Sequence, residues 1–305
     1  MSSSSPRRAR AILRAAWHTL RRNPRLLWFS LLLGLASLAV TSAGAVLGWM
    51  GISAVPWLAA HGVAAPPDAS LAGRAAIGFG LVLWFGTHLV APYFGVALAS
   101  ATLEALASRP FSVRRSLGVA TRQVGGIATY AVLDASVGAI IARMRDAGGS
   151  RRGRSRRAAR RRGGSPLTAT LLGAGWWAAT YLVLPVIARE SRGGVAAVGR
   201  STTLMRDTWK EAFVGRLVLG WVLWPVALMA VGALGVLLMV GVTPLGQPVL
   251  FGAVAAVSVL FYVAIAAVAH TLETVYRCAL YVFATEGVVP EPFADPELDA
   301  IWIVR

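Results

Sequence analysis

Long apolar segments that are almost free of charge alternate with short basic segments along this chain. Each apolar segment is about as long as a bilayer-crossing helix, because a helix rises about 1.5 Å per residue and roughly 20 residues cover the hydrocarbon layer. The six segments are residues 26–50, 75–103, 124–141, 167–188, 217–242 and 249–272. The pattern therefore predicts an all-α, polytopic transmembrane helix bundle of six spans.

The basic segments also have a helical pattern. Residues 7–25, 111–122 and 195–209 each place apolar residues at helical spacing, with arginines off that stripe. Such a segment is typical of an amphipathic helix that lies in the membrane interface. Each precedes a pair of predicted spans, so we infer three copies of one unit, an interfacial helix followed by a helical hairpin. Candidate contacts to lipid phosphates in these helices are Arg14, Arg21, Arg115, Arg122, Arg200 and Arg206.

The domain organisation follows from the same alternation. We expect an N-terminal tail and basic helix over residues 1–25, a single transmembrane domain over 26–288, and a C-terminal tail over 289–305. Residues 143–165 are low in complexity and rich in arginine, and like charges repel, so they predict a disordered loop. With six crossings, both termini lie in the cytoplasm.

The third predicted span is the point where two rules conflict. Residues 124–141 form the shortest segment, and Asp134 lies in its middle. Counting basic residues on each side slightly favours five crossings, because cytoplasmic segments carry the excess of arginine. The repeat favours six, since it places all three basic helices on one side. We expect six crossings.

Composition supports the membrane class and limits the partners. The chain has 305 residues, 56% hydrophobic and 14% charged, with a net charge of +17, whereas soluble domains carry about 25% charged residues. The partners implied are the lipid bilayer and anionic phospholipid head groups. Nucleic acid is an unlikely partner, because no aromatic residues for base stacking interrupt the arginine-rich run. The lone cysteine, Cys278, excludes an internal disulfide.

Four ionisable residues within the spans form a candidate intramembrane polar site: Asp134, His88, His270 and Glu273. A carboxylate within a span must be protonated, paired or facing a cavity, so Asp134 indicates either a proton or cation site or a bond to a neighbouring helix. Glu273 and Arg277 are spaced as an i,i+4 ion pair at the interface. No metal or other cofactor is expected, because a metal site needs further ligands at helical spacing.

Two stretches of sequence carry a resemblance to a known family. One runs from Gly175-Trp176-Trp177 through Pro185 to Glu211, and the other covers residues 276–287. They resemble an uncharacterised prokaryotic family of six-span membrane proteins, a domain of unknown function. More distantly, they are similar to the membrane domains attached to some glycerophosphodiester phosphodiesterases. The resemblance implies a six-span fold and supplies no catalytic or binding residues, and no counterpart of the phosphodiesterase catalytic domain is found.

Three functions are compatible with these patterns. The first is a non-enzymatic protein of the cytoplasmic membrane whose basic helices hold the inner leaflet. The second is a small-solute or ion transporter or channel that uses Asp134, with His88 and kinks at Pro92 and Pro185. The third is a membrane-embedded enzyme acting on lipids, for which the candidate acids are Glu190, Asp207, Glu211 and Glu286. The sequence favours a protein without enzymatic activity, because the motifs of the familiar catalytic classes are missing.

Overall fold

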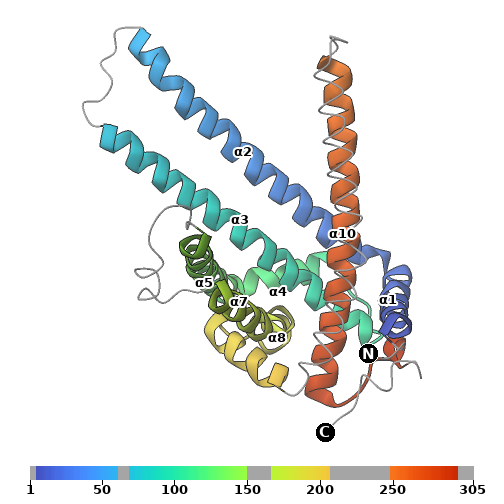
Figure 1. Cartoon of the computed structure of the whole chain (residues 1–305). Helices are drawn as coiled ribbons and strands as arrows, with labels where there is room; N and C mark the ends of the chain where they lie inside the picture. Colours follow the sequence, from blue (N-terminus) through green and yellow to red (C-terminus); the bar gives the residue numbers. More distant parts are fainter. Residues whose placement is uncertain (1–4, 61–68, 150–165, 207–247, 295–305) are drawn as a thin grey trace.

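The computed structural model describes residues 5–60, 69–149, 166–206 and 248–294. Within these residues the chain is helical and contains no strand, which confirms the all-α class (Figure 1). The α-helices with defined bounds are α1 Ser5–Arg22, α2 Leu27–Ala60, α3 Ala69–Leu106, α4 Val113–Arg122, α5 Val124–Gly149, α7 Pro166–Thr180, α8 Val183–Glu190 and α10 Pro248–Glu286. Residues 194–206 are also helical, and two 3-10 helices are η1 Pro24–Leu26 and η2 Glu291–Phe293.

Five membrane-length segments are found in the described part of the chain. They are apolar enough and long enough to cross a bilayer, and they are Pro24–Gly44, His88–Leu106, Val124–Arg145, Leu167–Glu190 and Leu260–Glu286. Each corresponds to one predicted span, and the doubtful third span is among them as 22 residues of helix. The remaining predicted span, residues 217–242, lies outside the described residues. The protein is therefore a membrane-embedded helical bundle.

Helix α3 lies at the centre of the bundle and packs against α2, α4, α5, α8 and α10. Helices α2 and α3 form a long hairpin, and α10 crosses their lower part (Figure 1). The approach of α2 to α10 is close at Gly34, where an added Cβ would lie 2.8 Å from Cγ1 of Val263. Small residues of this kind allow membrane helices to pack by van der Waals contact where no hydrophobic effect drives them together.

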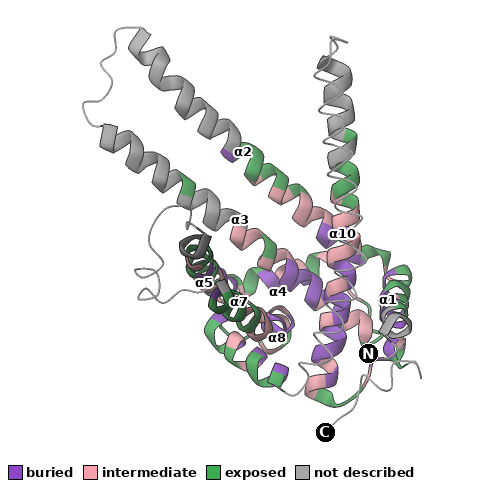
Figure 2. Ribbon diagram, viewed as in Figure 1, coloured by how far each residue is buried: buried purple, intermediate pink, exposed green. Residues whose placement is uncertain are grey.

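The buried core is concentrated where α3, α8 and α10 meet, at the end of the bundle away from the tip of the α2–α3 hairpin (Figure 2). Its largest fully buried side chains include Tyr181, Tyr276 and Phe29. On the outer face of α10, by contrast, Val257 and Phe261 are 65% and 61% exposed. Lipid is a favourable solvent for such side chains, whereas a water-soluble protein would aggregate through them.

All three predicted basic segments form amphipathic helices. Helix α1 packs against α10 and η2, and α4 packs against α3. Ile12, Ala16 and Leu20 of α1 lie in the core, as do Ala197 and Leu204 of helix 194–206, whereas Val195 at the start of that helix is 64% exposed. Trp17, at the edge of the apolar stripe of α1, is 46% exposed. The reason is the 100° turn per residue, which carries Trp17 past the narrow stripe centred on Ala16.

The fourth predicted span is two helices instead of one, because α7 ends at Thr180 and α8 begins at Val183. Pro185 explains the break: it has no N–H to donate to the carbonyl of Tyr181, four residues earlier. At the break, the backbone N–H of Leu182 donates instead to Oγ of the buried Ser201, at 3.1 Å. Ser201 lies on helix 194–206, so this bond fixes the third basic helix to the bundle.

Two helices continue beyond the segment boundaries that the sequence predicted. The arginine-rich loop was expected to begin at residue 143, but α5 continues to Gly149, and residues 150–165 lie outside the described part. The last span was expected to end at residue 272, but α10 continues to Glu286. In both cases charged residues ended the apolar run in the sequence. They did not end the helix, because helical hydrogen bonds tolerate charged side chains that are exposed or paired.

Candidate functional site

The polar side chains on one face of α10, which we call the α10 polar face, are His270, Glu273 and Arg277. His270 lies half-buried, with Nδ1 3.1 Å from Oγ of Ser30 on α2. The same Ser30 hydroxyl is 2.8 Å from Oγ1 of Thr271. These hydrogen bonds tie α10 to α2, so the imidazole has a structural partner on a neighbouring helix.

The predicted ion pair between Glu273 and Arg277 is confirmed, with Nη2 of Arg277 donating to Oε1 of Glu273 at 2.6 Å. The Arg277 guanidinium also lies over the ring of Tyr181, 4.7 Å from its centroid. A cation over an aromatic face is stabilised by the ring quadrupole. The sequence suggested that this pair lies at the membrane interface. It lies instead inside the segment Leu260–Glu286. Burial of this arginine is therefore compensated twice, by a carboxylate and by a tyrosine ring.

Asp134 lies half-buried on α5 and accepts a hydrogen bond from the indole Nε1–H of Trp176, at 2.8 Å. Because Trp176 is on α7, the bond joins the two helices of one predicted hairpin. Of the two interpretations of Asp134, this geometry corresponds to a bond between neighbouring helices. Tyr130, one turn earlier on α5, is buried and interacts electrostatically with both Asp134 and Arg277.

The four candidate residues come from three helices. His270 and Glu273 share the α10 polar face, Asp134 is on α5, and His88 lies half-buried on α3, one turn before Pro92. Helix α3 continues through Pro92 without a break. Within the described residues, no group of three metal-ligating side chains has the geometry to hold a metal ion.

A second polar group, which sequence reasoning did not assemble, surrounds Glu190 at the end of α8. Its carboxylate accepts hydrogen bonds from Nε of Arg192 at 2.6 Å, from Nε of Arg200 at 3.2 Å and from the hydroxyl of Tyr281 at 3.0 Å. Ser191 follows with a φ of 52°, which turns the chain sharply into helix 194–206. Glu190 therefore connects α8, helix 194–206 and α10.

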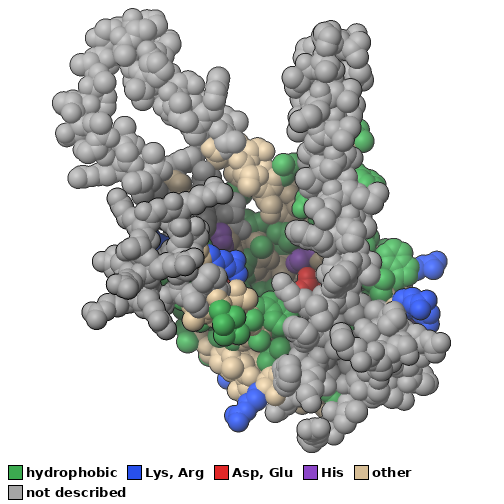
Figure 3. Space-filling model, viewed as in Figure 1, with side chains coloured by type: hydrophobic (Ala, Val, Ile, Leu, Met, Phe, Trp, Pro, Cys, Tyr) green, Lys and Arg blue, Asp and Glu red, His purple; other side chains and the backbone are tan. Residues whose placement is uncertain are grey.

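The candidate lipid contacts divide into two kinds. Arg14 and Arg21 on α1, Arg115 and Arg122 on α4, and Arg206 on helix 194–206 are exposed. Figure 3 shows basic side chains that project from the edge of the bundle beside α1. The sixth arginine, Arg200, is 35% exposed, and its Nε is bound to Glu190. Arg200 therefore stabilises the fold through its ion pair with Glu190, whereas the other five arginines have exposed side chains.

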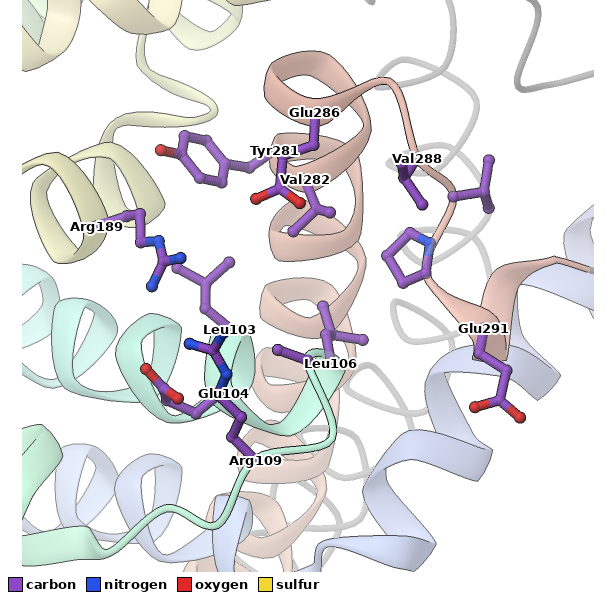
Figure 4. A pocket seen from close by; sticks show the side chains of 13 residues that line it. Leu103, Glu104, Leu106, Arg109, Arg189, Tyr281, Val282, Glu286, Val288 and Glu291 are labelled. Carbon is purple, nitrogen blue, oxygen red and sulfur yellow. The ribbon is translucent and has the colours of Figure 1, made fainter.

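A pocket of about 240 Å³ opens beside the Glu190 group. It is formed by the ends of α3, α8 and α10 and by the segment that follows α10, and Tyr281 belongs to both. Its charged lining residues are Glu104, Arg109, Arg189, Glu286 and Glu291. Figure 4 shows the side chains of Arg109 and Arg189 on one side of the pocket, Glu286 on α10 opposite, and Glu291 pointing away. We call this the helix-end pocket.

Sequence reasoning named only part of this pocket. Glu286 was a candidate acid of the lipid-enzyme hypothesis, as was Glu190 nearby, whereas Asp207 and Glu211 lie outside the described residues. Glu104, Arg109 and Arg189 were missed. A signal was present, since Glu104, Glu190 and Glu286 each stand at or near the end of a helix that closes one repeat unit.

Comparison with known proteins gives one match. Residues 76–290 match the sequence model of a group described as a family of unknown function, DUF6159. No curated protein and no solved structure matches the chain. The family assignment confirms the resemblance to a domain of unknown function, whereas the more distant similarity to phosphodiesterase membrane domains is not shown.

Proposed function

We propose that this chain, which belongs to the family of unknown function DUF6159, is a non-enzymatic integral membrane protein that binds the anionic head groups of one leaflet. The observation that carries the proposal is the position of its arginines. Five of the six candidate arginines, Arg14, Arg21, Arg115, Arg122 and Arg206, are exposed on three amphipathic helices, α1, α4 and 194–206. All three helices pack at the end of the bundle that also holds the C-terminal ends of α3, α8 and α10 (Figure 1).

The energetics favour this orientation. Each amphipathic helix buries its apolar face against the bundle, so its arginines point toward the surrounding head groups. A guanidinium matches the geometry of a phosphate with two parallel hydrogen bonds. Each arginine near an anionic surface contributes about 1 kcal/mol, and the attraction falls off within a Debye length. Five arginines on one side therefore give a strong preference for an anionic leaflet.

We place this end of the bundle on the cytoplasmic side of the cytoplasmic membrane, with both termini inside. The support is the positive-inside rule, together with the packing of α1 against η2. Because η2 follows α10, this contact brings the N-terminal helix and the segment after the last described helix to the same side of the bundle.

The proposal is tested with the full chain reconstituted in vesicles that contain phosphatidylglycerol and phosphatidylcholine. Electron spin resonance with chain-labelled lipids measures which head group the protein selects at its surface. The wild type is expected to select phosphatidylglycerol, and increasing salt is expected to weaken that selection. Changing Arg14, Arg21, Arg115, Arg122 and Arg206 together to Gln is expected to abolish it, and changing the same five to Lys is expected to preserve it. Unchanged selectivity in the Gln variant contradicts the proposal.

Transport is the alternative, and one observation favours it. Polar side chains occur within three membrane-length segments, and the buried Tyr130 lies one turn before Asp134 on α5. A pathway for protons or cations needs such groups in sequence across the bundle. Flux into proteoliposomes that is lost on Asp134→Asn, with the fold intact, supports transport. No flux of any tested ion with or without a proton gradient counts against it.

A further inference from the structure

We infer that the helix-end pocket binds a phosphoethanolamine group, the head group of a zwitterionic phospholipid. The inference rests on the proposed function, because it takes this end of the bundle to lie at the bilayer surface. It goes beyond that function by naming a bound ligand at a defined site. Three features of the pocket carry it: its depth, its charges and its size.

The depth follows from the helices that form the pocket. The membrane-length helical segments of α3, α7–α8 and α10 end at Leu106, Glu190 and Glu286, respectively. The pocket lies among these ends, with Leu103, Leu106 and Val282 in its wall. Because the end of a membrane-spanning helix lies at the bilayer surface, we take the pocket to lie at the level of the lipid head groups. A lipid head group reaches it without leaving the membrane surface.

The positive side of the pocket suits a phosphate. Arg109 follows the end of α3, and Arg189 is the penultimate residue of α8. Both are exposed, and neither forms an ion pair with another described residue. Figure 4 shows the two side chains reaching toward the same part of the pocket from different elements. Two guanidinium groups that converge in this way supply paired donors for phosphate oxygens.

The side of the pocket opposite the two arginines suits an ammonium group. Glu286 on α10 lies there, whereas Figure 4 shows Glu104 beside Arg109, and neither carboxylate has an ion-pair partner in the described part of the chain. The two carboxylates would repel a ligand that carries only a negative charge, and the two arginines would repel a ligand that carries only a positive charge. Only a ligand that carries both charges, a short distance apart, is attracted by every charged group. A primary ammonium also donates hydrogen bonds to carboxylates. A quaternary ammonium does not, because it has no N–H group.

The size limits the ligand to a head group. The pocket volume of about 240 Å³ is below the roughly 300–1,000 Å³ that is typical of sites for larger small molecules. Tyr281 holds one wall in place, since its hydroxyl donates to Glu190, which is itself held by Arg192 and Arg200. The pocket wall on α10 is therefore fixed before a ligand arrives, and preorganisation of this kind reduces the entropic cost of binding.

Native mass spectrometry of the full chain, solubilised in detergent with equal amounts of phosphatidylethanolamine and phosphatidylcholine, tests the inference. The wild type is expected to retain one phosphatidylethanolamine in preference to phosphatidylcholine, because three methyl groups remove the ammonium donors. Arg189→Gln and Glu286→Gln are each expected to weaken that retention about tenfold, because each substitution removes one charge-assisted hydrogen bond to the head group. The matched control is Arg114→Gln, on the exposed face of α4 and outside the pocket lining.

Competition identifies the source of the ligand and separates this inference from the proposed function. Displacement of the lipid by free phosphoethanolamine, but not by inorganic phosphate, supports recognition of the head group. Equal retention of the two lipids by the wild type, or unchanged retention in both pocket variants, overturns the inference. If the pocket variants keep their lipid while the five-arginine Gln variant loses its selection of phosphatidylglycerol, the inference fails and the proposed function stands. If the pocket variants lose their lipid while the five-arginine Gln variant keeps its selection of phosphatidylglycerol, the proposed function alone is overturned.

Discussion

At the scale of single residues, polar side chains within the spans are held by specific partners: Asp134 by Trp176, and Arg277 by Glu273 and the ring of Tyr181. Asp134 was expected either to serve a proton pathway or to bond to another helix, and the structure pairs it with Trp176. Glu273 and Arg277 were paired correctly, because both partners lie on one helix at a fixed spacing. The contact of Arg277 with Tyr181 was missed, since it depends on how α8 packs against α10.

The Asp134–Trp176 bond leads to a first prediction. Asp134→Asn keeps a side-chain oxygen that accepts from the indole, so thermal stability in detergent should change little. Asp134→Ala and Trp176→Phe each remove one partner, and each should destabilise the protein by about 1 kcal/mol. The double variant should be no less stable than the worse single variant, which a double-mutant cycle measures. Additive losses would show that the two side chains do not interact.

Ser201 gives a second prediction at this scale. Its hydroxyl is the acceptor for the backbone N–H of Leu182 at the α7–α8 break, and both residues are fully buried. Ser201→Ala leaves that donor without its partner and should cost about 1–3 kcal/mol. Thr202→Ala is the matched control, since Thr202 is exposed and its hydroxyl bonds only to Val198 of its own helix. Equal stability of the two variants, measured by thermal unfolding, would be contrary to this account.

At the scale of elements, the sequence predicts helices well and their interruptions poorly. Length and hydropathy located five spans that the structure describes, because an apolar run of bilayer length has few other stable forms. A kink was expected at Pro185, but not a break at residues 181–182 that divides the span into two helices. Pro92 and Pro185 look alike in the sequence, yet α3 continues through Pro92 and the other helix stops before Pro185. What differs is the surroundings, where Ser201 satisfies the freed Leu182 N–H.

A matched pair of glycines tests the packing of helix 194–206. A Cβ on Gly194 would lie 2.6 Å from the carbonyl oxygen of Gly126 and even closer to the backbone of Tyr130, whereas a Cβ on Gly193 meets nothing within 4 Å. Backbone atoms of a helix do not move aside as the end of a side chain does. Gly194→Ala should therefore destabilise by at least about 1–3 kcal/mol, and Gly193→Ala should change the melting temperature little. A harmless Gly194→Ala would show that helix 194–206 does not pack closely on α5.

At the scale of the whole molecule, the charge pattern predicted which segments are alike but not what they build together. Three basic segments were predicted to be copies of one unit, and in the described residues each contains a helix at the same end of the bundle. The helix-end pocket could not be derived from any one segment. Glu104, Arg189 and Glu286 are far apart in the sequence and meet only because α3, α8 and α10 end together.

In the proposed topology, α1, α4 and helix 194–206 lie on one side of the membrane, which requires α5 to cross it. Single cysteines at His18, Arg114 and Thr202, all exposed positions on these helices, report their sides. Cys278 is fully buried and is replaced by Ala in the background. In sealed vesicles of known orientation, a membrane-impermeant maleimide should label all three cysteines from the cytoplasmic side alone. Labelling of the Thr202→Cys variant from the opposite side would contradict the account.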